Sequence, residues 1–129
     1  MFRTALTNQT DPDRDMLPSK IVTSEQMRVI EARSEKAGVS TDALMERAGL
    51  EVGRRVRHHL GHLLGVPIAV LIGPGNNGGD GLIAARCLHD AGARVFCALV
   101  RSRDEADANY RAVLEREIAI VAIDDPALF

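Results

Sequence analysis

Apolar residues recur at a spacing of four in the first half of this chain of 129 residues. The series consists of Leu44, Ala48, Val52, Val56 and Leu60. This spacing gathers the side chains on one face, so we expect an amphipathic helix that starts after Ser40. Gly49 and Gly53 lie beside the series and indicate close packing against another backbone.

Short unbroken apolar runs replace this pattern in the second half, at residues 67–72, 95–100 and 118–123. Runs of this length that are rich in β-branched residues are typical of strands buried on both faces of a sheet. Amphipathic segments at 80–91 and 104–117 separate the three runs. The alternating order βαβαβ predicts a parallel sheet with right-handed crossovers.

A further helix is expected near the N-terminus. Thr23 and Gln26 have the spacing of a capping box, and Gly38 is a suitable helix stop because it tolerates positive φ. We therefore expect an α/β fold, a Rossmann-like three-layer α/β/α arrangement with a parallel sheet. Only its first three strands (βαβαβ) are present, after two N-terminal helices.

Residues 1–20 are polar and have no periodicity, which predicts a disordered tail ahead of an ordered part at 21–129. A doubly wound sheet normally needs five or more strands to bury its strands on both faces. Three strands therefore predict a truncated chain, a fragment, or a chain whose sheet is completed by a partner. Exposed apolar sheet surface also predicts self-association.

Composition excludes several classes of protein. A net charge of −2 and an aromatic content of 3% give no reason to expect nucleic-acid or membrane binding. Cys87 and Cys97 have no metal-binding spacing, so we expect reduced thiols in a cytoplasmic protein. His58, His59 and His62 lack a nearby acid or cysteine that would complete a metal site, and we interpret them as cations at a helix end.

A glycine-rich segment, GPGNNGGDG at 73–81, follows the first apolar run directly. In parallel α/β sheets, ligands bind at this carboxyl end of a strand. Five glycines in nine residues suggest close approach of a ligand to the backbone, although a tight strand–helix connection is the alternative. The spacing also fits GxGxxG, and Arg101 and Arg103 would suit the 2′-phosphate of NADP.

Asp80 argues against an ordinary dinucleotide loop. A carboxylate at a helix N-terminus repels phosphate and favours ribose hydroxyls, a cation or a capping role. Asn76 and Asn77 add amide groups that suit hydroxyls, carbonyls or a hard cation.

The glycine-rich segment GPGNNGGDG, together with the LIAARCL that follows it, closely resembles the signature loop of the YjeF N-terminal family, which includes the NAD(P)H-hydrate epimerases. The stretches TSEQMR from residue 23, LMERAG from residue 44 and GARV from residue 92 are similar to the family in the same order. The family often has Asn where this chain has Arg47. The resemblance covers about residues 21–123.

The resemblance implies interconversion of the R and S forms of hydrated NADH and NADPH. A partner dehydratase would then restore the intact cofactor from the S form. By the same resemblance, the substrate would contact Asn76, Asn77, Gly78, Gly79 and Asp80, and Asn77 would also bind a potassium ion.

The family's catalytic aspartate belongs to a second half that would lie beyond Phe129, so no catalytic residue is assigned. Asp124, Asp125 and Pro126 are interpreted as a turn at a strand end. Two alternatives stay open: a non-catalytic ligand-binding or dimerisation module of the same family, and a fragment of an NADP-binding oxidoreductase. A homo-oligomer is also possible.

Overall fold

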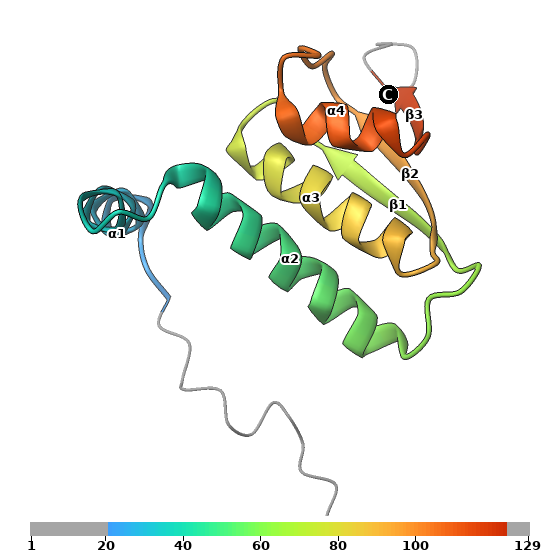
Figure 1. The fold of residues 1–129 in the computed structure, drawn as a ribbon, viewed down its shortest axis with the longest axis horizontal. Helices are drawn as coiled ribbons and strands as arrows, with labels where there is room; N and C mark the ends of the chain where they lie inside the picture. The colour runs from blue at the N-terminus through green and yellow to red at the C-terminus, as the bar shows by residue number, and fades with distance from the viewer. Residues whose placement is uncertain (1–20, 124–129) are drawn as a thin grey trace, which may run out of the picture.

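The computed structural model describes residues 21–123 of the chain (Figure 1). The predicted tail at 1–20 and the predicted turn at 124–126 lie outside these residues. The elements are α1 (Ser24–Lys36), α2 (Thr41–Leu60), β1 (Pro67–Ile72), α3 (Asn76–Asp90), β2 (Arg94–Leu99), α4 (Ala108–Glu115) and β3 (Ala119–Ala122).

The three strands form one parallel sheet in the order β1-β2-β3. Ile72 at the end of β1 is level with Leu99 in β2, which is level with Ala122 in β3. The pairing continues past the strand ends, because Val100 N–H donates to Ile72 O at 3.0 Å and Ile123 N–H to Leu99 O at 2.8 Å. The predicted α/β fold with a parallel βαβαβ unit is confirmed.

Helices cover one face of this sheet. Figure 1 shows α3 and α4 in front of the strands, α2 alongside α3, and α1 at the far end of α2. The core lies between the sheet and α3 and α4, where Ile72, Cys97, Leu82 and Val113 are fully buried.

The opposite face of the sheet carries Leu71, Phe96 and Val121, all of them exposed. The prediction that the strands are buried on both faces is therefore wrong for residues 21–123. The physical reason is that none of the helices in this range packs on that side. The described residues provide the sheet and one helical layer of the expected three-layer arrangement.

The predicted helix starts are confirmed by their caps. Thr23 Oγ1 accepts from Gln26 N–H at 3.2 Å while Gln26 Oε1 accepts from Thr23 N–H at 2.8 Å, which completes the capping box. Ser40 Oγ accepts from Ala43 N–H at 3.2 Å at the start of α2. Gly38 has a φ of +87°, as a helix stop requires.

The packing face of α2 differs from the predicted apolar series. Ala48 and Val52 are exposed, whereas Gly49 and Gly53 are buried against α3. A Cβ on Gly49 would lie 2.5 Å from Ile83 Cβ, so the small residues set the distance between the two helices. The prediction of close backbone packing is confirmed, and the apolar face is rotated toward the glycines. No helix between residues 21 and 123 is long and apolar enough to cross a membrane.

Candidate functional site

The glycine-rich segment spans the end of β1 and the beginning of α3. Helix α3 starts at Asn76, four residues earlier than the predicted start at residue 80, and Gly75 is its N-cap. The first turn of the helix therefore consists of the sequence that was expected to form a loop. Its N-terminus lies at the carboxyl end of the sheet, where ligands bind in folds of this kind.

Two of the five glycines are explained by the protein itself. A Cβ on Gly78 would lie 2.0 Å from Gly73 O, and a Cβ on Gly79 would lie 2.5 Å from Met45 Sδ of α2. Close ligand approach is therefore the wrong explanation for these two positions. Gly73 and Gly75, in contrast, have open space where a Cβ would be.

Arg103, in the connection after β2, holds the turn between β1 and α3. Its Nη1 donates to Gly73 O at 2.8 Å and, at 3.4 Å, to Gly75 O. Its Nε and Nη2 donate to Asp107 Oδ2 at 2.9 and 2.6 Å. Burial by itself raises the pKa of Asp107, but hydrogen bonds from Arg103 and from the N–H groups of Tyr110 and Asn109 bring it below its usual value. Asp107 is therefore a carboxylate that balances the guanidinium.

This pairing corrects one sequence interpretation. Arg103 was expected to suit a 2′-phosphate, yet its side chain is only 13% exposed and its charge is balanced by Asp107. Arg101 is exposed. The alternative of an NADP-binding oxidoreductase depended on Arg101 and Arg103 as phosphate ligands, and only Arg101 remains for that role.

A pocket of about 360 Å³ opens beside the first turn of α3. Asn76 and Asp80, four residues apart on one face of the helix, contribute its polar side. Helices α1 and α2 contribute the rest of the lining, which is Met27, Ile30, Glu31, Thr41, Leu44, Met45 and Ala48. The result is a largely apolar pocket whose polar groups are the Asn76 amide and the Asp80 carboxyl of α3, the Glu31 carboxyl of α1 and the Thr41 hydroxyl of α2.

Asp80 is the electrostatically unusual group of this pocket. Burial raises the pKa of its carboxyl above the ordinary value. Within residues 21–123, no basic side chain forms an ion pair with it. A half-buried carboxylate without a cation is ready to accept hydrogen bonds from hydroxyl groups of a ligand.

The start of α3 also offers backbone donors. Gly78 N–H donates to Gly75 O at 3.0 Å. The N–H groups of Asn76 and Asn77 have no acceptor among the described residues, and both side chains are exposed. Two free N–H groups at the positive end of a helix of 15 residues can bind phosphate or carbonyl oxygens.

The structure thus gives the predicted site residues different places. Asn76 and Asp80 face the same pocket, Gly78 and Gly79 are buried beneath the turn, and Asn77 is exposed outside the pocket lining. Met45 and Arg103 were not predicted as parts of this arrangement. For Arg103 a signal existed, because Arg103 and Asp107 have the i, i+4 spacing of an ion pair at a helix start.

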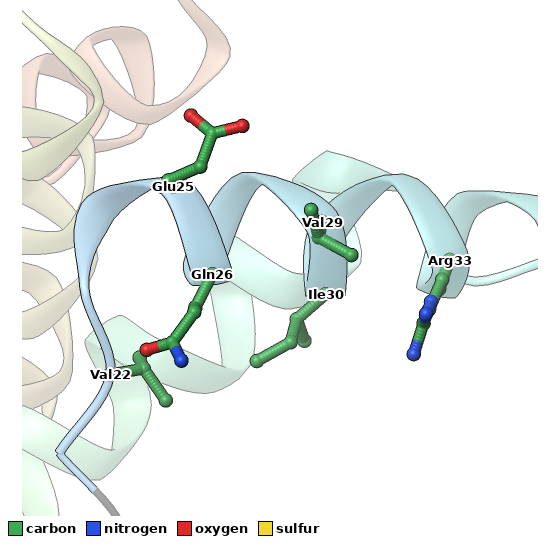
Figure 2. Close-up of a pocket in the computed structure, with 6 residues that line it drawn as sticks. All are labelled: Val22, Glu25, Gln26, Val29, Ile30 and Arg33. Carbon is green, nitrogen blue, oxygen red and sulfur yellow. The ribbon is translucent and has the colours of Figure 1, made fainter.

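Other features of the surface offer less chemistry. A hollow of about 310 Å³ runs along α1, and Figure 2 shows that Val22, Val29 and Ile30 line it together with Glu25, Gln26 and Arg33. All six belong to α1 or the residues just before it. Across residues 21–123, no group of three or more His, Cys, Asp and Glu side chains could hold a metal ion. His58, His59 and His62 are exposed.

The chain matches known proteins over most of its length. The family model for the YjeF-related protein N-terminus matches residues 41–126. An NAD(P)H-hydrate epimerase of Yarrowia lipolytica is 45% identical over 109 residues, which are 82% of this chain and 44% of that protein. A bifunctional NAD(P)H-hydrate repair enzyme Nnr of Thermofilum pendens is 38% identical over 113 residues, 82% of this chain and 21% of the relative.

A solved structure agrees with these relatives. The crystal structure of the yeast protein ynu0, YNL200c, superposes with a TM-score of 0.72 and 26% identity, and the match covers 85% of this chain and 50% of that protein. The chain therefore spans between a fifth and a half of the length of these relatives.

Proposed function

This chain belongs to the family of the YjeF-related protein N-terminus, and from that premise we propose that it is the substrate-binding part of an NAD(P)H-hydrate epimerase. The reaction would interconvert the R and S forms of hydrated NADH and NADPH. The observation that carries the proposal is the pocket at the first turn of α3, where Asn76 and Asp80 face one apolar hollow. Relatives that contain matching sequence are named for this activity.

The chemistry of the turn suits a hydrated dinucleotide. The Asp80 carboxylate would accept hydrogen bonds from hydroxyl groups, either of a ribose or of the hydrated nicotinamide ring. The free N–H groups of Asn76 and Asn77 would donate to phosphate oxygens at the helix N-terminus. Gly78 and Gly79 have no side chains, so they would contribute through their backbone. Their buried positions also pack the turn against Met45 and Arg103.

Potassium is part of the proposal through Asn77. The amide oxygen of this exposed side chain is the type of hard ligand that such a cation prefers. The carbonyl oxygens of Gly73 and Gly75 already accept hydrogen bonds from Arg103. Asn77 would therefore supply one ligand, and the resemblance assigns the others to the family's second half. When bound, the ion would supply positive charge that offsets the negative charge of the substrate's phosphates.

We also propose a cytoplasmic location and a dehydratase as the functional partner. Cys87 and Cys97 are both free thiols, and burial raises the pKa of Cys97 to about 11, which keeps it unreactive. A dehydratase fits the proposal because an epimerase supplies the isomer that such an enzyme consumes.

A non-catalytic ligand-binding or dimerisation module of the same family is the second candidate. The exposed apolar sheet face of Leu71, Phe96 and Val121 favours it, because such a face is suited to association. A homo-oligomer would be one form of this candidate.

The test is epimerisation of purified R-form hydrated NADPH, coupled to an S-specific dehydratase, with and without potassium. The variants are Asp80→Ala and Asn77→Ala, and His58→Ala at the far end of α2 is the control. Because the resemblance assigns the catalytic aspartate to the family's second half, we expect activity from a protein that carries this part together with such a second half. That activity should depend on potassium, fall with both site variants and be unchanged in the control. A folded protein of this kind that binds the substrate without converting it would favour the module. Binding of intact NADP that depends on Arg101 would favour the oxidoreductase.

A further inference from the structure

We propose that Arg103 is a positioning residue that holds the turn between β1 and α3 in the conformation that binds the substrate. This inference rests on the proposed function, because the turn is taken to be the substrate site. Arg103 itself does not line the pocket of Asn76 and Asp80. It acts through the backbone of Gly73 and Gly75.

The donors of Arg103 connect two segments that are far apart in the sequence. Nη1 reaches the carbonyl of Gly73, 30 residues away at the end of β1, at 2.8 Å. The Nε and Nη2 groups donate to Oδ2 of Asp107, the residue that caps α4, at 2.9 and 2.6 Å. Asp107 Oδ1 in turn accepts from Asn109 N–H at 2.9 Å. The turn is thereby tied to the start of α4 through one planar guanidinium.

The turn needs such a tie because of its composition. Gly73 and Gly75 have no side chain to pack, and the space where a Cβ would lie is open at both. Their carbonyl oxygens are the two that Arg103 engages. Hydrogen bonds from this largely covered cation to the two oxygens replace the side-chain contacts that glycine cannot make.

The fit between Arg103 and Gly78 supports the same role. A Cβ on Gly78 would lie 2.7 Å from Arg103 Nη1 and 2.0 Å from Gly73 O. The absence of a side chain at Gly78 therefore makes room for the guanidinium and the carbonyl that it holds. Since Asp107 balances the charge, the guanidinium fixes the backbone and leaves phosphate binding to the N–H groups of α3.

The experiment compares four variants of the full chain with the wild type. Arg103→Met removes the donors at similar length, and Arg103→Lys retains the charge on a single nitrogen that cannot form the same planar set of bonds. Asp107→Asn keeps a good helix cap but removes the charge that anchors Arg103. Arg111→Met, exposed on α4, is the control. Two quantities are measured: hydrogen exchange of the Gly78 and Gly79 amides without ligand, and the Kd for hydrated NADPH.

We expect Arg103→Met to speed exchange at these two amides and to weaken binding, each by about tenfold, the loss typical of a charged hydrogen bond. Arg103→Lys and Asp107→Asn should give smaller changes in the same direction, and Arg111→Met none. If Arg103→Met fails to fold, the other two variants decide the matter by the same readouts. Wild-type exchange and wild-type Kd in the folded variants would overturn the inference.

The two readouts separate this inference from the proposed function. If the wild-type chain does not bind hydrated NADPH, the proposed function fails, and faster exchange in Arg103→Met still supports the positioning role. If the wild-type chain binds and Arg103→Met binds equally well with unchanged exchange, the positioning role fails alone.

Discussion

The two faces of the sheet differ in what covers them. On the face toward α3 and α4, Ile72 and Cys97 are fully buried. On the opposite face, their neighbours Leu71 and Phe96 are 73% and 40% exposed, together with Val121 at 49%. The alternation follows from the strand geometry, because successive side chains point to opposite faces.

The difference shows which side of the sheet the described residues cover themselves. The first turn of α3, the pocket beside it and the contacts of Arg103 all belong to the covered side. The opposite, bare face, which carries Leu71, Phe96 and Val121, contributes no residue to that pocket. The site therefore depends on packing that the chain itself provides, whereas the apolar side chains of the bare face are not covered by any helix among residues 21–123.

The largest difference should appear between two adjacent residues of β1. Ile72→Ala leaves a cavity in the core and should lower the free energy of unfolding by about 3 kcal/mol. Leu71→Ala, on the bare face, should change it by less than about 1 kcal/mol. Urea unfolding of both variants at the same low protein concentration measures the contrast. Equal losses would mean that the bare face is covered in solution.

The glycine-rich segment allows a second matched pair. Gly78→Ala forces a Cβ against the Gly73 carbonyl and should destabilise the chain by about 2 kcal/mol. Gly75→Ala places its Cβ in open space, so it should change the free energy of unfolding by less than about 0.5 kcal/mol. Thermal unfolding of the two variants compares them. A tolerant Gly78 would contradict the close packing of the turn against Arg103.

The bare face should also govern self-association. An exposed apolar sheet surface is expected to drive oligomer formation that increases with protein concentration. Leu71→Lys places a charge on this face and should shift the equilibrium toward the monomer, whereas Val29→Lys on α1 should not. Sedimentation velocity over a range of concentrations measures this. A wild-type chain that stays monomeric throughout would show that the bare face does not self-associate.

The smallest effect concerns Asp80 on the covered side. Burial raises the pKa of its carboxyl, so the folded chain holds that proton more tightly than the unfolded chain. Its contribution to stability is therefore greatest at low pH and decreases as the pH rises through the raised pKa. Asp80→Asn should raise Tm slightly at pH 7 while weakening substrate binding, and the gain in Tm should vanish below the ordinary pKa of aspartate. A lower Tm at pH 7 would mean that the ionised carboxylate stabilises the fold.

Local sequence signals predicted the elements well. The capping box of Thr23 and Gln26, the Ser40 cap and the three apolar runs indicated helices and strands whose bounds agree within a few residues. The start of α3 was missed because glycines disfavour helices, and here the packing of Gly79 against Met45 overrides that preference. The bare sheet face was missed because these runs have apolar residues on both faces, and the sequence does not show which of the two faces a helix covers.

The site was predicted in part. The segment at 73–81 was correctly identified as the feature at the carboxyl end of β1. The distribution of its residues was not, because the division into pocket-facing Asn76 and Asp80 and buried Gly78 and Gly79 depends on the helix beginning at Asn76. The role of Arg103 depends on a contact 30 residues away, which no local spacing records.

The most direct test of the account is to map where hydrated NADPH binds on the wild-type chain. Amide chemical shifts of the labelled protein are followed by NMR as hydrated NADPH is added. The account predicts shifts concentrated at residues 76–80 and at the pocket lining from α1 and α2, with Asp80→Ala removing them. Shifts confined to the bare sheet face, or the absence of saturable shifts from a folded chain, would contradict it.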